Sequence, residues 1–591
     1  MDFSKSKKAI LGTVLLSSAA LGMALSTPVG QSVFGTPTVY AAQVDNGLKS
    51  NSHLSVSSGW SNDLQSISWN SSRGGYDIYY LRSADGASNV FGEQGQNWEH
   101  SFTKDFKTYE KQVSAIAAKG GDNTDGWKSA WTGAVIESTG NIKGTSKGQK
   151  VAYFSGLKKS DGKQNIWAVA STDGGKTFTQ PLNNGKAIMT TNNSLNGVDF
   201  RDPYVFTWNS KLMMYVAEGD NIGVYTSTDG VSWSKADKSR ASKIGNGTFF
   251  KGRSWANNAP VECPVIKTMT MPNGKTKQVL FFGAKDASKG ETTGTYYIVG
   301  HLDSNGLFAE ETDVKRLDQG SDYYGANFSG TTDISQSNKS ITSLGWVGNW
   351  NYTAKGVHSD EAATSGYLST LGSYSSARTL TLDNNMTIKQ SVIEPSAATT
   401  RKYTDVTKTH TVRGANAAWS GQWVDREDAN WGSVYGLYDV ANTNVSQTYT
   451  LNFTSTKGNY TGRIYIDIWQ GGDYVRFNYD PSNGLYNVKS RSGELDKGLE
   501  GQVSSSYYYD GILGNGNGYS ADSGLKNWKV AQLKVITDKT SVEFIFPNGQ
   551  TYTIARYSNS EKQDFKIFTQ DPNSANKVTV TVSDNVQNVV K

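Results

Sequence analysis

Short apolar and aromatic runs recur along most of the chain, and each run has the length of a β-strand. They occur, for example, at residues 76–81, 151–154, 166–170, 212–216 and 279–282. Gly, Asn, Asp or Ser residues bound each run, as is typical of strands that end in turns. Apolar residues rarely recur at the spacing of an amphipathic helix, whereas Tyr, Thr, Val, Ser and Gly are frequent. The pattern therefore predicts an all-β protein.

A turn motif repeats in the first part of the chain. In each copy a turn-forming Asp ends one strand, and an aromatic residue four or five positions later begins the next. The Asp residues are Asp105, Asp173, Asp229 and Asp303, at spacings of 68, 56 and 74 residues. Repetition at this interval, with one four-stranded sheet per unit, is typical of a β-propeller. About five blades fit between residues 55 and 390.

The composition changes between residues 391 and 412, where Ser, Ala, Thr and Lys follow one another without periodicity. We interpret this segment as a linker after the propeller. Strand-length runs resume beyond it, for example at residues 448–453 and 542–546. A C-terminal β-sandwich over residues 413–591 is the simplest architecture for them.

The N-terminus has the pattern of a secretory signal peptide. Three Lys residues among the first eight form a basic patch, a mostly apolar run follows, and small residues stand at Ala41 and Ala42. We predict cleavage there, which removes residues 1–42 and leaves a secreted, extracellular protein. A retained membrane anchor is the alternative, although the apolar run barely reaches the ~18–20 residues that span a bilayer.

Charge and residue usage narrow the classes of function. The chain has 58 Lys+Arg against 53 Asp+Glu, and a net charge of +5 over 591 residues is too weak to indicate nucleic-acid binding. The single cysteine, Cys263, excludes an intramolecular disulfide, and the five His residues show no metal-binding spacing. We expect no metal, no cofactor, no membrane contact after signal cleavage, and a monomer.

Three acidic segments stand at strand-like positions of the predicted propeller. They are Asn62-Asp63, Arg201-Asp202-Pro203 and Glu262-Cys263-Pro264. Because the innermost strands of different blades meet around one axis, we expect Asp63, Asp202 and Glu262 to share an axial pocket. Such a set suits glycoside hydrolysis, in which one carboxylate attacks and a second acid protonates the leaving oxygen. For any single acid, a turn cap or a solvated side chain is the plainer alternative.

At these segments the sequence resembles the glycoside hydrolase family 32 β-fructosidases, which include invertases, inulinases and levanases. The family's Arg-Asp-Pro and Glu-Cys boxes match closely. Its Trp-Met-Asn-Asp-Pro-Asn-Gly box is less well kept, because this chain reads Trp60-Ser61-Asn62-Asp63-Leu64-Gln65. The resemblance implies a five-bladed β-propeller followed by a β-sandwich. It also implies that Asp63 is the nucleophile, Asp202 the transition-state stabiliser and Glu262 the acid/base.

Further matches to the family's boxes extend over nearly the whole mature chain. The resemblance implies substrate contacts from Asn62, Gln65, Trp98, Trp131, Thr132, Arg201, Cys263, Tyr324 and Trp350. For Cys263 and the large aromatic residues, core packing is the alternative. One Gln expected from the family is missing where Leu81 ends an aromatic strand, so one contact of the sugar pocket is unaccounted for.

The resemblance implies retaining hydrolysis of β-fructosidic bonds. The form of the first box looks more like that of levan-acting members, so β-2,6-linked levan is the expected substrate, with inulin and sucrose secondary. Two rivals stay open. A fructosyltransferase, such as a levan fructotransferase, would share the covalent intermediate, and a non-catalytic fructan-binding protein would share only the pocket.

Overall fold

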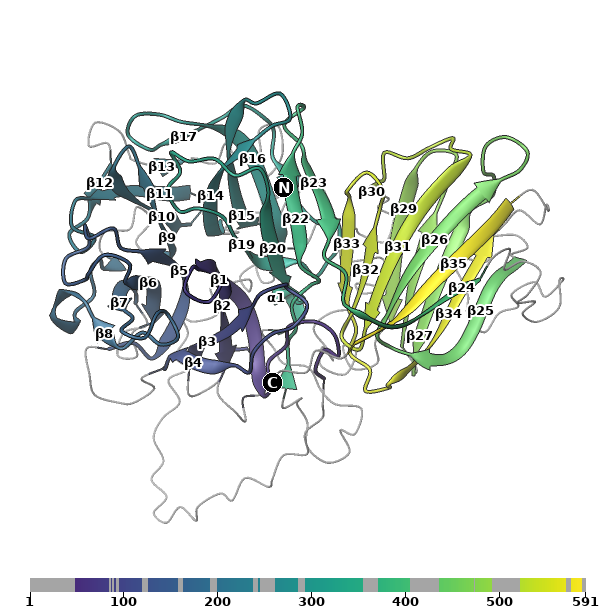
Figure 1. Ribbon diagram of the computed structural model, residues 1–591, viewed down its shortest axis with the longest axis horizontal. Coiled ribbons are helices and arrows are strands. Elements are labelled where there is room, and N and C mark those ends of the chain that lie inside the picture. Colours follow the sequence, from purple (N-terminus) through teal and green to yellow (C-terminus); the bar gives the residue numbers. More distant parts are fainter. Residues whose placement is uncertain are drawn as a thin grey trace, which may run out of the picture.

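The computed structural model describes residues 48–83, 87, 90–91, 95–118, 126–157, 163–191, 199–219, 221–236, 243–244, 261–284, 293–353, 370–403, 435–471, 473–491, 521–569 and 576–586. The expected signal peptide lies outside these residues. The described strands form a ring of sheets in the N-terminal part and a stacked pair of sheets in the C-terminal part (Figure 1). No helix in the described segments is long and apolar enough to cross a membrane.

Five antiparallel sheets make up the propeller. Blade 1 consists of β1 (Gly59–Asn70), β2 (Gly75–Ser83), β3 (Gln96–Thr103) and β4 (Val113–Ile116). Blade 2 consists of β5 (Ser129–Glu137), β6 (Lys150–Leu157), β7 (Gln164–Ala170) and β8 (Gln180–Pro181). Blade 3 consists of β9 (Arg201–Trp208), β10 (Lys211–Glu218), β11 (Asn221–Ser227), β12 (Ser234–Lys235) and β13 (Lys243–Ile244).

The last two blades follow the same order. Blade 4 consists of β14 (Glu262–Thr270), β15 (Thr276–Ala284), β16 (Gly294–Leu302), β17 (Phe308–Glu310) and β18 (Lys315–Arg316). Blade 5 consists of β19 (Tyr324–Phe328), β20 (Ile341–Trp346), β22 (Arg378–Leu382) and β23 (Ile388–Val392). Within the described residues two short helices interrupt the strands, the 3-10 helix η1 (Asn183–Gly185) and α1 (Trp350–Thr353).

The first strands of the blades surround the propeller axis. Strands β1, β5, β9, β14 and β19 contact one another in this order, and β19 returns to β1. Short β21 (Thr370–Leu371) pairs in parallel with β1 and ties the C-terminal part of the propeller to its first blade. This closure brings residues from every blade to one axial region, as expected from the propeller pattern of the sequence.

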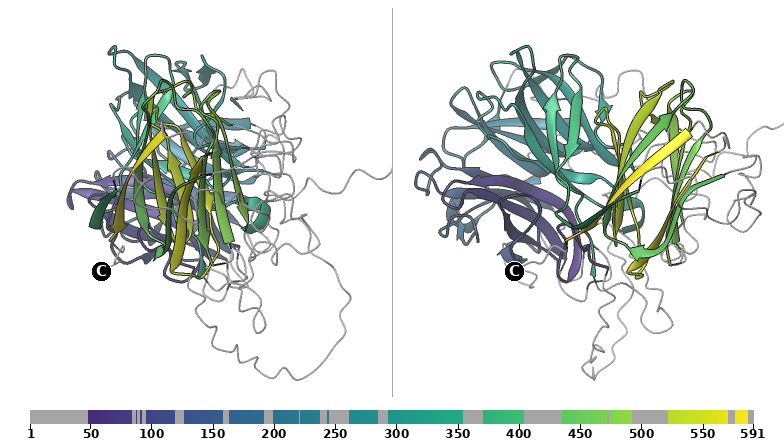
Figure 2. Two further views of the ribbon diagram at one scale, coloured as in Figure 1. Left: turned by 90° about the vertical axis from the view of Figure 1, so that its right-hand side faces the viewer. Right: turned by 45° about the vertical axis from the view of Figure 1, so that its right-hand side comes forward.

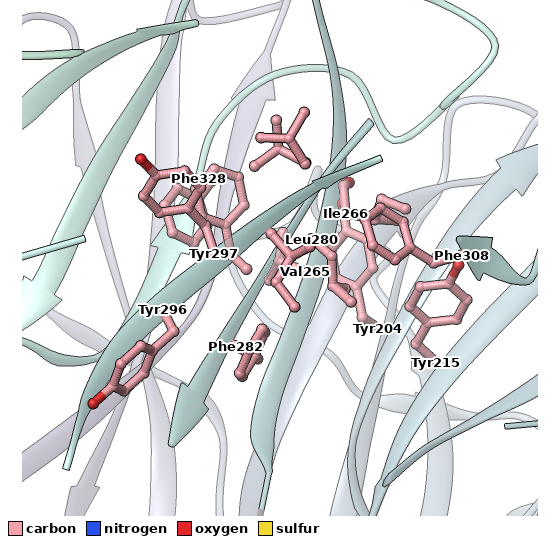
Figure 3. Close-up of a cluster of buried hydrophobic side chains, with 14 of the residues drawn as sticks. Tyr204, Tyr215, Val265, Ile266, Leu280, Phe282, Tyr296, Tyr297, Phe308 and Phe328 are labelled. Carbon is pink, nitrogen blue, oxygen red and sulfur yellow. The ribbon is translucent and has the colours of Figure 1, made fainter. Parts of the chain in front are cut away.

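Buried aromatic and branched side chains fill the space between blades. Figure 3 shows the cluster between blades 3, 4 and 5, to which Tyr204, Leu280 and Phe328 belong. Phe281 stacks on Phe328 with ring centroids 3.9 Å apart. Contacts of this kind join neighbouring blades without disulfides, because the one cysteine of the chain is free.

Two six-stranded sheets form the sandwich (Figure 2, right). One sheet has the order β24 (Ala397–Tyr403), β35 (Asn576–Asn585), β26 (Gln447–Ser455), β31 (Val530–Asp538), β32 (Ser541–Ile545) and β33 (Thr551–Ala555). The other has the order β25 (Tyr435–Asn444), β34 (Lys562–Thr569), β27 (Ile464–Gln470), β28 (Asp473–Tyr479), β29 (Leu485–Arg491) and β30 (Ala521–Asp522). Aromatic rings meet between the sheets, and Phe477 of β28 stacks on Phe544 of β32 at 4.8 Å. The predicted fold class, an all-β propeller followed by a sandwich, is confirmed.

The segment interpreted as a linker, residues 391–412, differs in part from that interpretation. Residues 397–403 form β24, which pairs antiparallel with β35 at the edge of a sandwich sheet. Six of the seven side chains of β24 are exposed, so the strand has no buried face and no alternation of polar and apolar residues. Sequence periodicity could not reveal such a strand.

The sandwich packs against the propeller through its edge strand β33. The backbone amides of Gln319 and Asp322, which lie between blades 4 and 5, donate to the carbonyl oxygens of Thr551 and Thr553 at 2.9 and 3.2 Å. The amide of Ala555 in turn donates to the Asp322 carboxylate. These hydrogen bonds join the edge of the sandwich sheet to the propeller.

Candidate active site

Each innermost strand of the propeller carries a one-residue β-bulge near its first residue. The bulges lie in the segments 61–64, 130–133, 201–204, 262–265 and 324–327. In a regular strand consecutive side chains point to opposite faces, whereas a bulge re-aims them. Consecutive residues of one strand can therefore reach the same axial cavity.

A cavity lies at these bulges, around the propeller axis. Its lining residues are Asn62, Asp63, Leu81, Phe91, Gln96, Trp131, Thr132, Arg201, Asp202, Glu262 and Trp350. Three neighbouring pairs of this set, 62–63, 131–132 and 201–202, are consecutive residues within a bulge. The three acidic groups singled out in the sequence thus meet in one cavity, although they come from blades 1, 3 and 4.

The backbone at the second position of three bulges is left-handed. Asp202, Cys263 and Gly325 have φ angles of 58°, 52° and 49°. At Gly325 a side chain would also collide with the site, because a Cβ there would lie 2.3 Å from Oδ1 of Asp63. A non-glycine residue in this region is strained, so strain is concentrated where the carboxyl groups converge.

Asp63 is buried, and its two carboxylate oxygens have different surroundings. Oδ2 accepts hydrogen bonds from Thr132 Oγ1 at 3.1 Å and from Cys263 Sγ at 3.6 Å. Oδ1 has no hydrogen-bond partner in the described protein. Burial, followed by repulsion from Glu262 and Asp202, raises the pKa of Asp63 to about 8. One oxygen of this carboxyl group is therefore buried beside Gly325 without a hydrogen bond from the described residues.

Asp202 is held by the backbone of the neighbouring blade. Its Oδ2 accepts a hydrogen bond from the Cys263 amide at 2.9 Å, and its own amide donates to Ser155 Oγ at 2.7 Å. Burial raises the pKa of Asp202 to about 6, and repulsion from Glu262 adds to this effect while Arg201 opposes it. Both raised pKa values mean that the cluster retains protons at a pH where free carboxyl groups have lost them.

Glu262 is anchored through both oxygens. Oε1 accepts from Arg201 Nε at 3.2 Å and from Arg201 Nη2 at 2.8 Å, and Oε2 accepts from the hydroxyl of Tyr324. Arg201 also pairs with Asp199. Burial would lower the pKa of Arg201, but the surrounding carboxylates raise it above its ordinary value. Arg201 thus supplies a fixed positive charge between the acidic groups.

The structure separates the expected substrate contacts into two groups. Asn62, Trp131, Thr132, Arg201 and Trp350 line the cavity. The other four lie behind it and are Gln65, Trp98, Cys263 and Tyr324. Of these, Cys263 donates hydrogen bonds to Asp63 and Asp202, and Tyr324 donates one to Glu262.

Gln65 and Trp98 support the cavity wall and are not part of it. The Gln65 side chain donates to the carbonyl of Asp63 and accepts from the amide of Gly133, both at 2.8 Å. The fully buried Trp98 donates from Nε1 to the carbonyl of Trp131 at 2.8 Å. Their placement corrects the expectation that both touch substrate, since each instead fixes the backbone of a residue that lines the cavity.

Three residues that line the cavity were not predicted from the sequence as substrate contacts, namely Leu81, Phe91 and Gln96. Phe91 stacks on Trp350 with ring centroids 5.5 Å apart and planes at 15°. Gln96 stands two positions before Trp98, so the two side chains lie on the same face of the strand. This spacing was the only feature of the sequence that could have indicated Gln96. No group of three or more His, Cys, Asp or Glu in the described part of the chain is arranged to hold a metal ion.

Comparison with known proteins identifies the family of the chain and solved structures with a similar fold. Residues 53–395 match the model of the Glycosyl hydrolases family 32 N-terminal domain. A levanbiose-producing levanase of Bacillus subtilis (strain 168) is 29% identical over 306 residues, which cover 51% of this chain and 53% of that protein. A second levanbiose-producing levanase, from Geobacillus stearothermophilus, is 29% identical over 285 residues, covering 47% of this chain and 64% of that protein. The chain thus spans between half and two thirds of the length of these relatives.

Among solved structures, the β-fructofuranosidase of Schwanniomyces occidentalis complexed with fructosyl-erythritol superposes with a TM-score of 0.67. The match covers 93% of this chain and 100% of that chain at 16% sequence identity. At this identity the likeness concerns the fold, and it extends over both the propeller and the sandwich.

Proposed function

The chain belongs to glycoside hydrolase family 32, and from this premise we propose that it hydrolyses β-fructosidic bonds of fructans with retention of configuration. The observation that carries the proposal is the single cavity in which Asp63, Asp202 and Glu262 converge around Arg201. One carboxyl group there has an oxygen without a partner among the described residues, and another is anchored through both of its oxygens. A retaining glycosidase needs this division between a nucleophile and an acid.

In the first proposed step, a carboxylate oxygen of Asp63 attacks the anomeric C2 of a fructosyl unit. The bond from C2 to the leaving oxygen breaks, and this oxygen takes the proton of Glu262. In the second step, Glu262 removes a proton from water, the water oxygen bonds to C2, and Asp63 leaves as a carboxylate. Asp202 accepts hydrogen bonds from ring hydroxyls as positive charge develops at C2.

The proposed mechanism needs one proton in the acidic cluster, and the raised pKa values provide it. With the pKa of Asp63 at about 8 and that of Asp202 at about 6, the acidic cluster holds one proton near neutral pH. The raised pKa of Asp63 places this proton on Asp63 in the free protein, so the proposed mechanism requires that substrate binding moves the proton to Glu262 and leaves the negative charge on Asp63. Hydrogen bonds from Thr132 and Cys263 favour the charged form of Asp63 and therefore this arrangement.

We propose β-2,6-linked levan as the main substrate, with inulin and sucrose as secondary ones. The support is the form of the first box and the likeness to two levanbiose-producing levanases. We further propose that the protein is secreted, since the N-terminal 42 residues have the pattern of a signal peptide, and separately that it is a monomer. Terminal sequencing and light scattering of the protein from culture medium test these two points.

The central experiment incubates the purified protein with levan, inulin and sucrose and separates the products by chromatography. Levan is expected to be cleaved fastest. Free fructose alone would indicate exo-action, oligosaccharides endo-action, and longer chains or cyclic dianhydrides a transferase. Absence of turnover with every substrate would overturn the proposed activity, and retained fructan binding would then favour the non-catalytic alternative.

Two variants test the roles of the acidic residues. Glu262→Gln is expected to lower turnover of unactivated fructans by about 10²- to 10⁴-fold without loss of folding, because the leaving oxygen loses its proton donor. Asp63→Asn is expected to abolish any covalent fructosyl adduct in mass spectra of the intact protein. Glu110→Gln, at a half-exposed side chain outside the cavity, is the matched control. Near-normal activity of Glu262→Gln would show that the acid is misassigned.

A further inference from the structure

The blade 1 wall of the cavity contains a hydrogen-bonding gap. Strand β2 contributes only the apolar Leu81 to the lining, at the position where a glutamine was expected. The neighbouring tyrosines of β2 do not compensate, because the hydroxyl of Tyr79 donates to the carbonyl of Gly175 and that of Tyr80 bonds to Ser101. A sugar bound here receives no hydrogen bond from β2.

Gln96, at the start of the adjacent strand β3, places a carboxamide on the same wall. Its side chain is almost completely buried and lines the cavity. Its Nε2 donates to Oδ1 of Asn62 at 2.8 Å, and the Gln96 side chain makes no other hydrogen bond with the described residues. Gln96 therefore has a second amide hydrogen and a carbonyl oxygen left for a ligand.

The backbone holds both carboxamides in place. Gln96 donates its amide to Ser129 Oγ at 3.2 Å, and the preceding Gly95 lies so close to blade 2 that a Cβ would approach the Lys128 carbonyl to 2.4 Å. The carbonyl of Asn62 accepts a hydrogen bond from Tyr374 at 2.7 Å. Two fixed carboxamides side by side offer both donors and acceptors, and a sugar hydroxyl needs one of each.

We infer that Gln96 is a specificity-determining and positioning residue, which binds one hydroxyl of the fructosyl unit and orients Asn62 beside the nucleophile Asp63. This inference rests on the proposed function, because it takes a furanose ring as the occupant of the cavity. In this arrangement Gln96 of β3 makes the hydrogen bond to the sugar that no side chain of β2 can make. A site that bonds a particular hydroxyl strongly rejects an analogue without it, because a buried polar group is then left unpaired.

The test measures binding by calorimetry, so that it does not depend on turnover. Fructose and its monodeoxy analogues are titrated into the wild type, into Gln96→Met, and into the control Gln278→Met, whose glutamine lies on β15 outside the cavity. We expect Gln96→Met to bind fructose about 10- to 100-fold more weakly. The wild type and the control should reject one particular deoxy analogue that Gln96→Met binds as well as fructose.

The outcomes separate the inference from the proposed function. Unchanged fructose affinity in Gln96→Met overturns the inference, and so does weaker binding with every analogue still discriminated as in the wild type. A wild type that binds neither fructose nor fructan overturns the proposed function and the inference together. Thermal unfolding of each variant checks folding, and Gln96→Ala replaces Gln96→Met if the thioether is not accommodated.

Discussion

Arg378 is the centre of a fully buried charge network that joins the propeller to the sandwich. Its guanidinium pairs with Asp318 at 2.7 Å and with Glu543 of strand β32 at 2.8 Å. It also donates to the hydroxyls of Thr551 and Thr553 at 2.8 and 2.6 Å. All three charged side chains have no exposed surface. The substitution Arg378→Met keeps much of the side-chain volume and removes the only cation of this trio.

The expected cost is about 3–5 kcal/mol of unfolding free energy, because removal of one partner leaves buried charge without compensation. This cost is large compared with that of an exposed pair. Arg401 and Asp584 form such a pair, with the Arg401 side chain 42% exposed. The matched control Arg401→Met should cost no more than about 1 kcal/mol.

The deficit of Arg378→Met should also depend on pH. Burial favours the neutral form of Asp318, but Arg378 and hydrogen bonds outweigh it and lower the pKa of that carboxyl group. In the wild type the ionised Asp318 carboxylate therefore stabilises the fold. This contribution is fully present above the unfolded-state pKa of about 4, and it is lost as the pH falls through the lower folded-state pKa. Without Arg378, burial raises the folded-state pKa above 4. The variant should therefore be most destabilised near pH 8 and less so near pH 4.

Urea unfolding monitored by tryptophan fluorescence at pH 4, 6 and 8 provides the measurement. The triple variant Arg378→Met, Asp318→Asn, Glu543→Gln should regain most of the stability, because it removes the orphaned charges as well. A deficit below 1 kcal/mol for Arg378→Met at pH 8, or one that grows toward pH 4, would refute this account of the network.

Three further changes test the cavity. Thr132→Val removes a donor that favours charged Asp63, so the acidic limb of the kcat/KM profile should move up by about one pH unit. Gly325→Ala should lower kcat at least about 100-fold, measured with levan, because its Cβ would displace the Asp63 carboxylate. Asp202→Asn should abolish activity yet stabilise the fold by about 1–3 kcal/mol at pH 8, because the raised pKa of Asp202 makes its charged form costly. In urea unfolding this gain should shrink as the pH falls from 6 to 4 and vanish near about pH 3, where the acid is neutral in both the folded and the unfolded state.

The sequence predicted the parts of the fold that depend on local pattern. Strand-length runs and repeated Asp turns sufficed for the propeller and the sandwich, because buried strands and tight turns restrict residue type strongly. Strand β24 was missed because exposed side chains leave no pattern. The Arg378 network was not predictable either, because its partners Asp318 and Glu543 come from distant segments and only the folded chain shows that they meet.

The candidate site was predicted through its acidic residues and only in part through its other contacts. Asp63, Asp202 and Glu262 stand in short motifs, and their convergence follows from ring closure. Residue type alone could not tell which polar or aromatic side chains face the axis. Trp98 was therefore expected in the pocket although it packs behind Trp131, and Gln96 was overlooked although it lines the wall.

The five bulges explain why the site differs from the rest of the propeller. Regular strands would point alternate residues toward the blade cores, and Asn62 could not then share a cavity with Asp63. The extra residue in each inner strand costs ladder hydrogen bonds and, at Asp202 and Cys263, a strained left-handed backbone. Packing between the blades offsets this cost away from the cavity. Stability and chemistry thus reside in different residues of the same strands, and variants in the cavity can lose activity while the fold persists.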